Sequence, residues 1–129
     1  MHLRPVLSIV GFVVLAAAGC GSATDNRPAK WSYIAPVIIE PNCATANCHS
    51  ELANRGNIRL DTVAKSYKAL QGFAAGSDPE KSFLITLLRG TNTTFQRMPP
   101  SYPLADADIS LIAEWAGAGA QWDGPGAQP

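Results

Sequence analysis

Apolar side chains recur at helical spacing in four segments of this chain, separated by stretches rich in polar residues, glycine and proline. Within each segment they return every three or four residues, which places them on one face of a helix. The segments span residues 32–40, 61–72, 77–90 and 106–116. No segment alternates apolar and polar residues long enough to predict a sheet strand, and residues 57–61 are at most a short extended piece. The pattern predicts an all-α domain of about four short helices.

Capping residues and helix breakers set the limits of these segments. Pro36 costs the first helix a hydrogen bond unless that helix begins late. The last segment is apolar around much of its girth, so we expect it to contact two partners, of which the first helix is one. The expected N-caps and stops are Asp61 or Thr62 and Gly72 for the second helix, and Ser77-Asp78 and Gly90 for the third.

The first twenty residues have the composition of an export signal. Arg4 precedes an almost wholly apolar run from Val6 to Ala18, which is shorter than the roughly 20 residues that a membrane-spanning helix needs. The run ends in Leu15-Ala-Ala-Ala-Gly-Cys20, which resembles the lipobox of bacterial lipoproteins, so we expect Cys20 to become the acylated first residue of the exported chain. The alternative is ordinary cleavage near Ala18, with Cys20 left free or buried. Both alternatives predict a protein of the periplasm or cell envelope.

Removal of a signal peptide at residues 1–19 leaves 110 residues, enough for one small domain. We expect a flexible tether at 20–30, the domain at 31–122 and a disordered tail at 123–129, because the two end stretches lack apolar periodicity. The exported part carries nine basic and ten acidic side chains without a basic stripe, which argues against nucleic acid as a partner. Gly21, in place of the aspartate linked with inner-membrane retention, slightly favours an outer-membrane anchor.

Two cysteines and a histidine form the most informative motif of the domain, Cys43-Ala-Thr-Ala-Asn-Cys48-His49. Two cysteine sulfurs can bond covalently to the vinyl groups of a haem while the histidine that directly follows ligates its iron. Four residues separate the cysteines instead of the usual two, but the second cysteine is still followed at once by the histidine. We therefore predict one covalently bound haem c, with Cys43 and Cys48 as attachment sites and His49 as an iron ligand. The alternative is a disulfide between the two cysteines.

Met98 is the expected second ligand of that iron. Met1 and His2 leave with the leader, so the exported chain keeps one methionine and one histidine. Met98 is followed by two prolines that would keep its loop stiff, whereas without a haem it would be an ordinary core-filling residue. Ligation by histidine and methionine would raise the reduction potential of the iron and close it to substrates. This combination favours an electron carrier over an enzyme.

Further short motifs accompany these residues in chain order: Ile58-Arg-Leu-Asp61, Gly76-Ser-Asp-Pro-Glu-Lys-Ser82 with Leu84-Ile85, Pro103-Leu104, Ile109, Ile112, Glu114-Trp115 and Gly119-Ala120. Together with the cysteine motif and Arg97-Met98-Pro99-Pro100, the series resembles the small single-haem cytochrome c domains of planctomycetes and deltaproteobacteria, over residues 34–122. The resemblance implies an all-helical cytochrome c fold in which the first and last helices cross. It also implies Cys43 and Cys48 as haem attachments, His49 as proximal ligand and Met98 as distal ligand.

Other side chains are candidates for contact with a haem. Arg59 or Arg97 is a candidate partner of a haem propionate, although a loop arginine is more often solvated. The second partner of the last helix is expected to be the haem edge. Six aromatic residues are candidate walls, with core packing as the alternative for most of them: Tyr67, Phe73, Phe83, Phe95, Tyr102 and Trp115.

Three functions follow from these observations. The first is an electron-transfer cytochrome c, held at a membrane by its lipid anchor, that passes single electrons between redox proteins of unknown identity. The second is a haem-free binding lipoprotein in which Cys43 and Cys48 form a disulfide. The third is a metal or haem enzyme. It is disfavoured because the motif offers fewer than the four ligands of a zinc site, and because an open iron requires that Met98 not coordinate.

Overall fold

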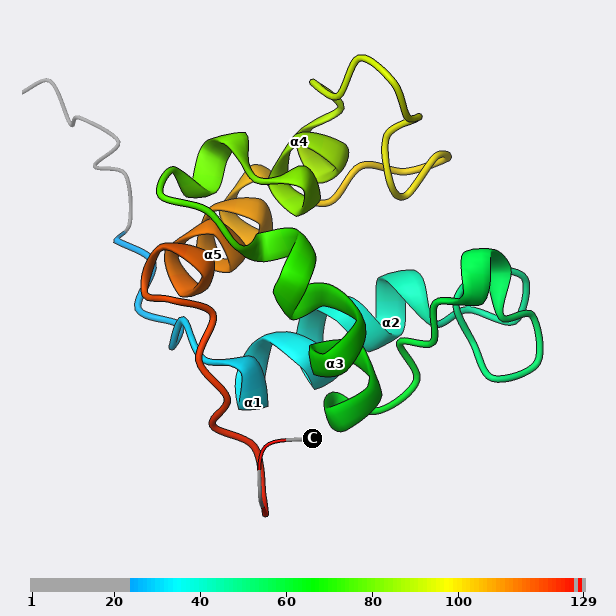
Figure 1. Ribbon diagram of the computed structural model, residues 1–129, viewed down its shortest axis with the longest axis horizontal. Coiled ribbons are helices and arrows are strands. Elements are labelled where there is room, and N and C mark those ends of the chain that lie inside the picture. The colour runs from blue at the N-terminus through cyan, green and yellow to red at the C-terminus, as the bar shows by residue number, and fades with distance from the viewer. Residues whose placement is uncertain (1–23, 127, 129) are drawn as a thin grey trace, which may run out of the picture.

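The computed structural model describes residues 24–126 and 128, and both Cys20 and the predicted signal peptide lie outside them. The described chain is helical and contains no strand (Figure 1), which confirms the all-α class. In chain order its elements are α1 (Trp31–Ile34), the π-helical turn η1 (Ala35–Ile39), α2 (Glu40–Cys43), the 3₁₀ turn η2 (Arg55–Asn57), α3 (Val63–Ala74), the 3₁₀ turn η3 (Pro79–Lys81), α4 (Phe83–Arg89) and α5 (Asp106–Gly117).

The first helix is longer than predicted, because α1, η1 and α2 follow one another without a break from Trp31 to Cys43. Pro36 lies in the π-helical turn η1, in which hydrogen bonds span five residues, such as the bond from the Glu40 N–H to the Ala35 carbonyl. The helix accommodates the proline by widening instead of ending. Its last residue is Cys43, so this helix delivers the first cysteine of the motif to its place.

The second predicted helix, α3, begins where expected and ends later. Thr62 is its N-cap, and the Thr62 hydroxyl accepts a hydrogen bond from the Lys65 N–H at 3.2 Å. The predicted stop at Gly72 is wrong. Gly72 does not adopt the left-handed conformation of a helix stop, and a Cβ at this position would meet no atom within 4 Å. The helix continues to Ala74, which is fully buried in the core.

The third predicted helix is two elements in the structure, η3 and α4. Asp78 caps η3 by accepting a hydrogen bond from the Glu80 N–H at 3.1 Å. Ser82 then takes an extended conformation and caps α4, with its hydroxyl 3.3 Å from the Ile85 N–H. This second cap breaks the segment that the apolar pattern predicted as continuous. Gly90 ends α4 in the left-handed conformation with φ 72°, as predicted.

The core is centred on the contact between α5 and the first helix. The indole rings of Trp31 and Trp115 lie 4.4 Å apart, and Tyr67 of α3 meets both rings edge-on. The Tyr67 hydroxyl donates a hydrogen bond of 3.0 Å to the carbonyl of Ala120, just after α5. These contacts confirm that the first and last helices pack together, and α5 also contacts α3, η3 and α4.

The segments at both ends of the domain lie against it. The Ser32 N–H and hydroxyl donate hydrogen bonds of 2.9 and 2.6 Å to the carboxylate of Asp123, and Arg27 pairs with Asp108 of α5. Described parts of the expected tether and tail therefore contact the domain, and the division of the chain into tether, domain and tail stays a prediction. Within residues 24–126 and 128, no helix has the length and apolarity needed to cross a membrane.

Candidate functional site

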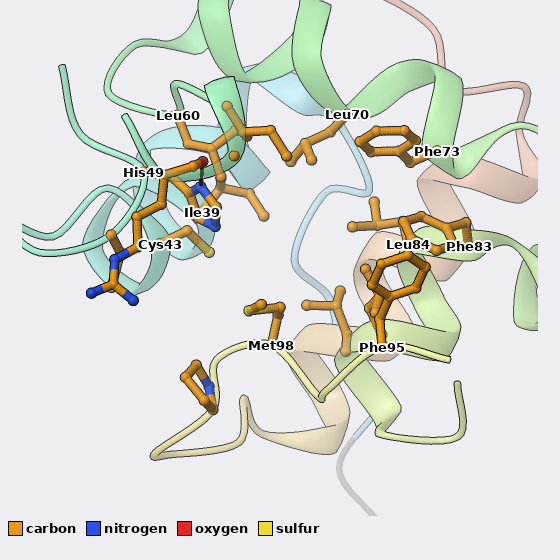
Figure 2. Close-up of a pocket in the computed structure, with 17 residues that line it drawn as sticks. Ile39, Cys43, His49, Leu60, Leu70, Phe73, Phe83, Leu84, Phe95 and Met98 are labelled. Atoms are coloured by element: carbon orange, nitrogen blue, oxygen red, sulfur yellow. Dashed lines mark hydrogen bonds between the residues drawn. The ribbon is translucent and has the colours of Figure 1, made fainter. Parts of the chain in front are cut away.

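A largely apolar cavity of about 400 Å³ opens between α2, α3, α4 and the loops that follow α2 and α4 (Figure 2). Its volume falls in the range of about 300–1,000 Å³ that is usual for ligand and cofactor sites. The four residues predicted to hold a haem, Cys43, Cys48, His49 and Met98, all line this one cavity. The other lining residues are Ile39, Arg55, Gly56, Ile58, Leu60, Leu70, Phe73, Phe83, Leu84, Leu87, Leu88, Phe95 and Pro100.

Backbone hydrogen bonds fold the cysteine motif into a closed loop at the end of α2. The Cys48 N–H donates to the Thr45 carbonyl at 3.0 Å, and the His49 N–H donates to the Cys43 carbonyl at 3.0 Å. The second bond joins the two ends of the motif, so the four intervening residues form a turn of their own. On the far side, the Leu60 N–H donates to the His49 carbonyl at 2.8 Å. Both sides of His49 are thus fixed by the main chain.

The imidazole of His49 is held by one further hydrogen bond, drawn as a dashed line in Figure 2. Its Nδ1 lies 3.0 Å from the carbonyl oxygen of Arg55. A carbonyl oxygen only accepts, so Nδ1 carries the proton and the lone pair of the neutral ring is on Nε2. A hydrogen bond of this kind on the second nitrogen is the usual way in which proteins orient a metal-binding histidine. His49 therefore has the tautomer and fixed position of a metal ligand.

The loop that supplies the Arg55 carbonyl needs residues that tolerate positive φ. Asn54, Gly56 and Asn57 have φ values of 43°, 64° and 59°, in the left-handed region that asparagine and glycine enter most easily. The Arg55 N–H donates to the Cys48 carbonyl at 3.1 Å, which ties this turn back to the motif. The sequence places the required residue types around Arg55, and the turn brings its carbonyl to His49.

Cys43 and Cys48 are both free thiols at the cavity wall, each partly buried. Burial raises the pKa of the Cys43 thiol to about 12, with a smaller contribution from Cys48. Within the described residues, no group of three or more histidine, cysteine or acidic side chains is arranged to hold a metal ion. The site therefore does not have the donor set of a zinc centre.

Met98 faces the cavity from the loop between α4 and α5, across from His49 and Cys43 (Figure 2). Its N–H donates to the Leu87 carbonyl at 3.1 Å, which fixes this point of the loop to α4. Met98, His49 and both cysteines also line a small adjoining hollow of about 40 Å³. The Met98 loop and the cysteine motif therefore approach each other there. The Met98 side chain is 39% exposed, so it is not a buried core-filling residue.

Three of the six candidate aromatic residues line the cavity. The rings of Phe73 and Phe83 lie 5.3 Å apart and those of Phe83 and Phe95 lie 5.5 Å apart, all edge to face, on the side away from Cys43 (Figure 2). Tyr67 and Trp115 belong to the core instead, and Tyr102 is 82% exposed. The expected contact of the last helix with the haem edge is wrong, because the cavity lining includes no residue of α5 and the second partners of α5 are α3, η3 and α4.

The two arginines predicted as propionate partners do not line the cavity. Arg59 lies 3.8 Å from Glu51, and Arg97 directs its guanidinium to the carbonyls of Pro99 and Pro100 at 3.5 and 3.4 Å. Arg55 is the arginine of the lining. Arg55 reaches the cavity because the loop turns there to bring the Arg55 carbonyl to His49. The sequence contains no signal that would have predicted Arg55 instead of Arg59 at this position.

No protein-family model, curated protein or solved structure matches this chain. Whether a haem fits this site is therefore judged from the donor groups and from the cavity that they line. Two thiols, an imidazole with its Nε2 lone pair free and a thioether line one apolar cavity of cofactor size. These groups are the ones that a covalently attached, doubly ligated haem requires, so the residues fit the group.

Proposed function

We propose that this protein is a single-electron carrier with one covalently bound haem c, folded as a small c-type cytochrome. The observation that carries the proposal is the common cavity of Cys43, Cys48, His49 and Met98, in which the hydrogen bond from His49 Nδ1 to the Arg55 carbonyl leaves Nε2 available. Neither a disulfide protein nor a zinc protein needs an apolar cavity opposite its cysteines. The wall of leucine and phenylalanine side chains supports an apolar occupant.

In this proposal Cys43 and Cys48 would hold the haem by thioether bonds, and His49 and Met98 would ligate its iron. The bound haem supplies a one-electron couple. His49 is oriented by the Arg55 carbonyl, and the apolar walls exclude water. The Met98 thioether is a soft donor that favours the reduced iron and raises the potential. An iron ligated by both side chains would leave no coordination site for a substrate, so we propose an electron carrier and not an enzyme.

The decisive experiment is an absorption spectrum of the reduced protein, made in a host with cytochrome c maturation machinery, together with its pyridine haemochrome and its mass after denaturation. We expect a c-type spectrum and a mass increased by one haem that survives denaturation. A colourless protein with the mass of the bare polypeptide would contradict the proposal.

The role of Met98 is tested by Met98→Ala, with Leu87→Ala as matched control. Both residues line the cavity, but only Met98 carries a donor atom. We expect Met98→Ala to become high-spin and to lose reduction potential, while Leu87→Ala keeps the spectrum of the parent protein. Identical spectra for Met98→Ala and the parent would show that Met98 is not a ligand.

The haem-free alternative is separated from this proposal by thiol alkylation with and without reductant. A Cys43–Cys48 disulfide releases two alkylatable thiols on reduction, whereas thioethers release none. Export and lipidation are part of the proposal as well, with redox proteins of the envelope as partners. Labelling with a radioactive fatty acid should mark the parent chain and not Cys20→Ala, and an unlabelled parent would remove the anchor from the proposal.

A further inference from the structure

The loop between α4 and α5 has few hydrogen bonds of its own to hold Met98. Before the thioether, the Met98 N–H donates to the Leu87 carbonyl at 3.1 Å. After it, three of the six residues 99–104 are prolines, which have no N–H to donate. In the part of the chain that the structure describes, the only hydrogen bonds made by residues 99–104 come from the Arg97 side chain, which donates to the carbonyls of Pro99 at 3.5 Å and Pro100 at 3.4 Å. Arg97 therefore reaches past Met98 and ties the backbone that follows it.

The Arg97 side chain is itself seated on the end of α4. A Cβ added to Gly90 would lie 3.1 Å from Cδ and 3.3 Å from both Cβ and Cγ of Arg97, so the arginine stem packs directly against the glycine that ends the helix. Arg27, Arg59 and Arg89 pair with carboxylates. Among the described residues, the guanidinium of Arg97 has only the two proline carbonyls as partners. One partly buried side chain thus joins the end of α4 to the backbone on the far side of the methionine.

We propose that Arg97 is a positioning residue that holds Met98 in place at the cavity. This inference rests on the proposed function, under which Met98 ligates the haem iron. Methionine has three rotatable bonds, and a ligand on a loose loop must be ordered each time it binds. A loop that is already ordered avoids this cost, so the two bonds from Arg97 would strengthen the ligation by Met98 without contact with the iron. Both bonds are longer than the usual distance of about 2.9 Å, so we expect a moderate effect.

The test is competition between Met98 and added imidazole for the iron of the haem-containing protein. Imidazole binds only where the thioether has left, so its apparent affinity rises as the bond to Met98 weakens. Arg97→Gln keeps the stem as far as Cδ and removes the guanidinium and its charge. Arg59→Gln removes the same charge from a residue outside the cavity lining and is the matched control. We expect the affinity for imidazole to rise about three- to tenfold in Arg97→Gln, to rise less in Arg97→Lys, which keeps a charged donor, and to stay unchanged in Arg59→Gln.

A double-mutant cycle separates positioning of Met98 from general damage to the fold. In the Met98→Ala background the affinity for imidazole should no longer depend on residue 97, because no thioether is left to position. An unchanged affinity in Arg97→Gln would overturn the inference. So would an equal rise in Arg97→Gln and Arg59→Gln, or a rise of the same size with and without the thioether of Met98.

Hydrogen exchange of the Met98 amide supplies a second measurement, which does not require a haem. Because this N–H donates to the Leu87 carbonyl, its exchange reports how often the loop opens. It should be about three- to tenfold faster in Arg97→Gln and unchanged in Arg59→Gln, and equal rates in Arg97→Gln and the parent would overturn the inference. A parent protein without haem, or one whose imidazole affinity is unchanged by Met98→Ala, would instead contradict the proposed function, so the two failures are distinguishable.

Discussion

Gly72 and Gly90 are both predicted from the sequence as helix stops, but replacing each with alanine should change stability in opposite directions. Gly90 ends α4 with φ 72°, and a Cβ there would lie 3.1 Å from Cδ of Arg97. Gly72 is a helical residue of α3 whose added Cβ would meet nothing within 4 Å. Alanine in the left-handed region costs about 1–2 kcal/mol. In an exposed helix interior, alanine instead gains about 0.5–1 kcal/mol over glycine.

Replacing glycine also stiffens the unfolded chain, which stabilises either variant by about 0.4–1 kcal/mol and is already contained in the helix-interior value. We therefore expect Gly90→Ala to destabilise the protein by about 1 kcal/mol and Gly72→Ala to stabilise it by a similar amount. Thermal unfolding followed by circular dichroism should place the two midpoints about 10 °C apart, with Gly72→Ala above the parent protein. A loss of stability in Gly72→Ala would mean that Gly72 is a helix stop after all, and would refute the reasoning from backbone conformation.

Two further predictions concern a buried hydrogen bond and an exposed ion pair. Tyr67→Phe leaves the Ala120 carbonyl without its buried donor and should cost about 1–2 kcal/mol in urea denaturation, whereas Tyr102→Phe, at an 82% exposed position, should change stability by less than about 0.5 kcal/mol; equal effects would contradict the burial assigned to Tyr67. The Arg27 side chain donates to Asp25 and lowers the pKa of that carboxyl from 3.8 to about 2. Because the pKa is depressed in the folded protein, the stability contributed by this pair is present above about pH 4 and is lost as the pH falls towards 2. Carboxyl titration by NMR should show a midpoint near 2 for Asp25 that returns towards 3.8 in Arg27→Gln, and an unchanged midpoint would count against the pair.

The all-α class and most helix starts could be predicted from sequence because they depend on local chemistry. The Thr62 cap and the Gly90 stop act within one turn of the chain. The errors arose where packing between distant segments decides the outcome. Gly72 stays helical since Ala74, two residues later, is buried in the core. The break at Ser82 likewise lies where the chain changes from η3 to α4, both of which pack on α5.

The sequence predicts the donor residues of the candidate site but not the residues that surround and orient them. His49 and the cysteines form a contiguous motif, and Met98 follows by elimination because the only other methionine, Met1, belongs to the predicted signal peptide. The Arg55 carbonyl was not predictable, since its distance from His49 depends on the left-handed turns of the loop. Which of the aromatic residues face the cavity is equally a property of the folded chain, because phenylalanine serves in a core and in a cavity wall alike.

The helix from Trp31 to Cys43 joins the start of the described chain to the candidate site. Its thirteen residues extend about 20 Å, from the segment that leads back to residue 24 (Figure 1) to Cys43, which lines the cavity. Under the proposed function, this helix therefore fixes the distance between the haem attachment at Cys43 and the Trp31–Trp115 contact in the core.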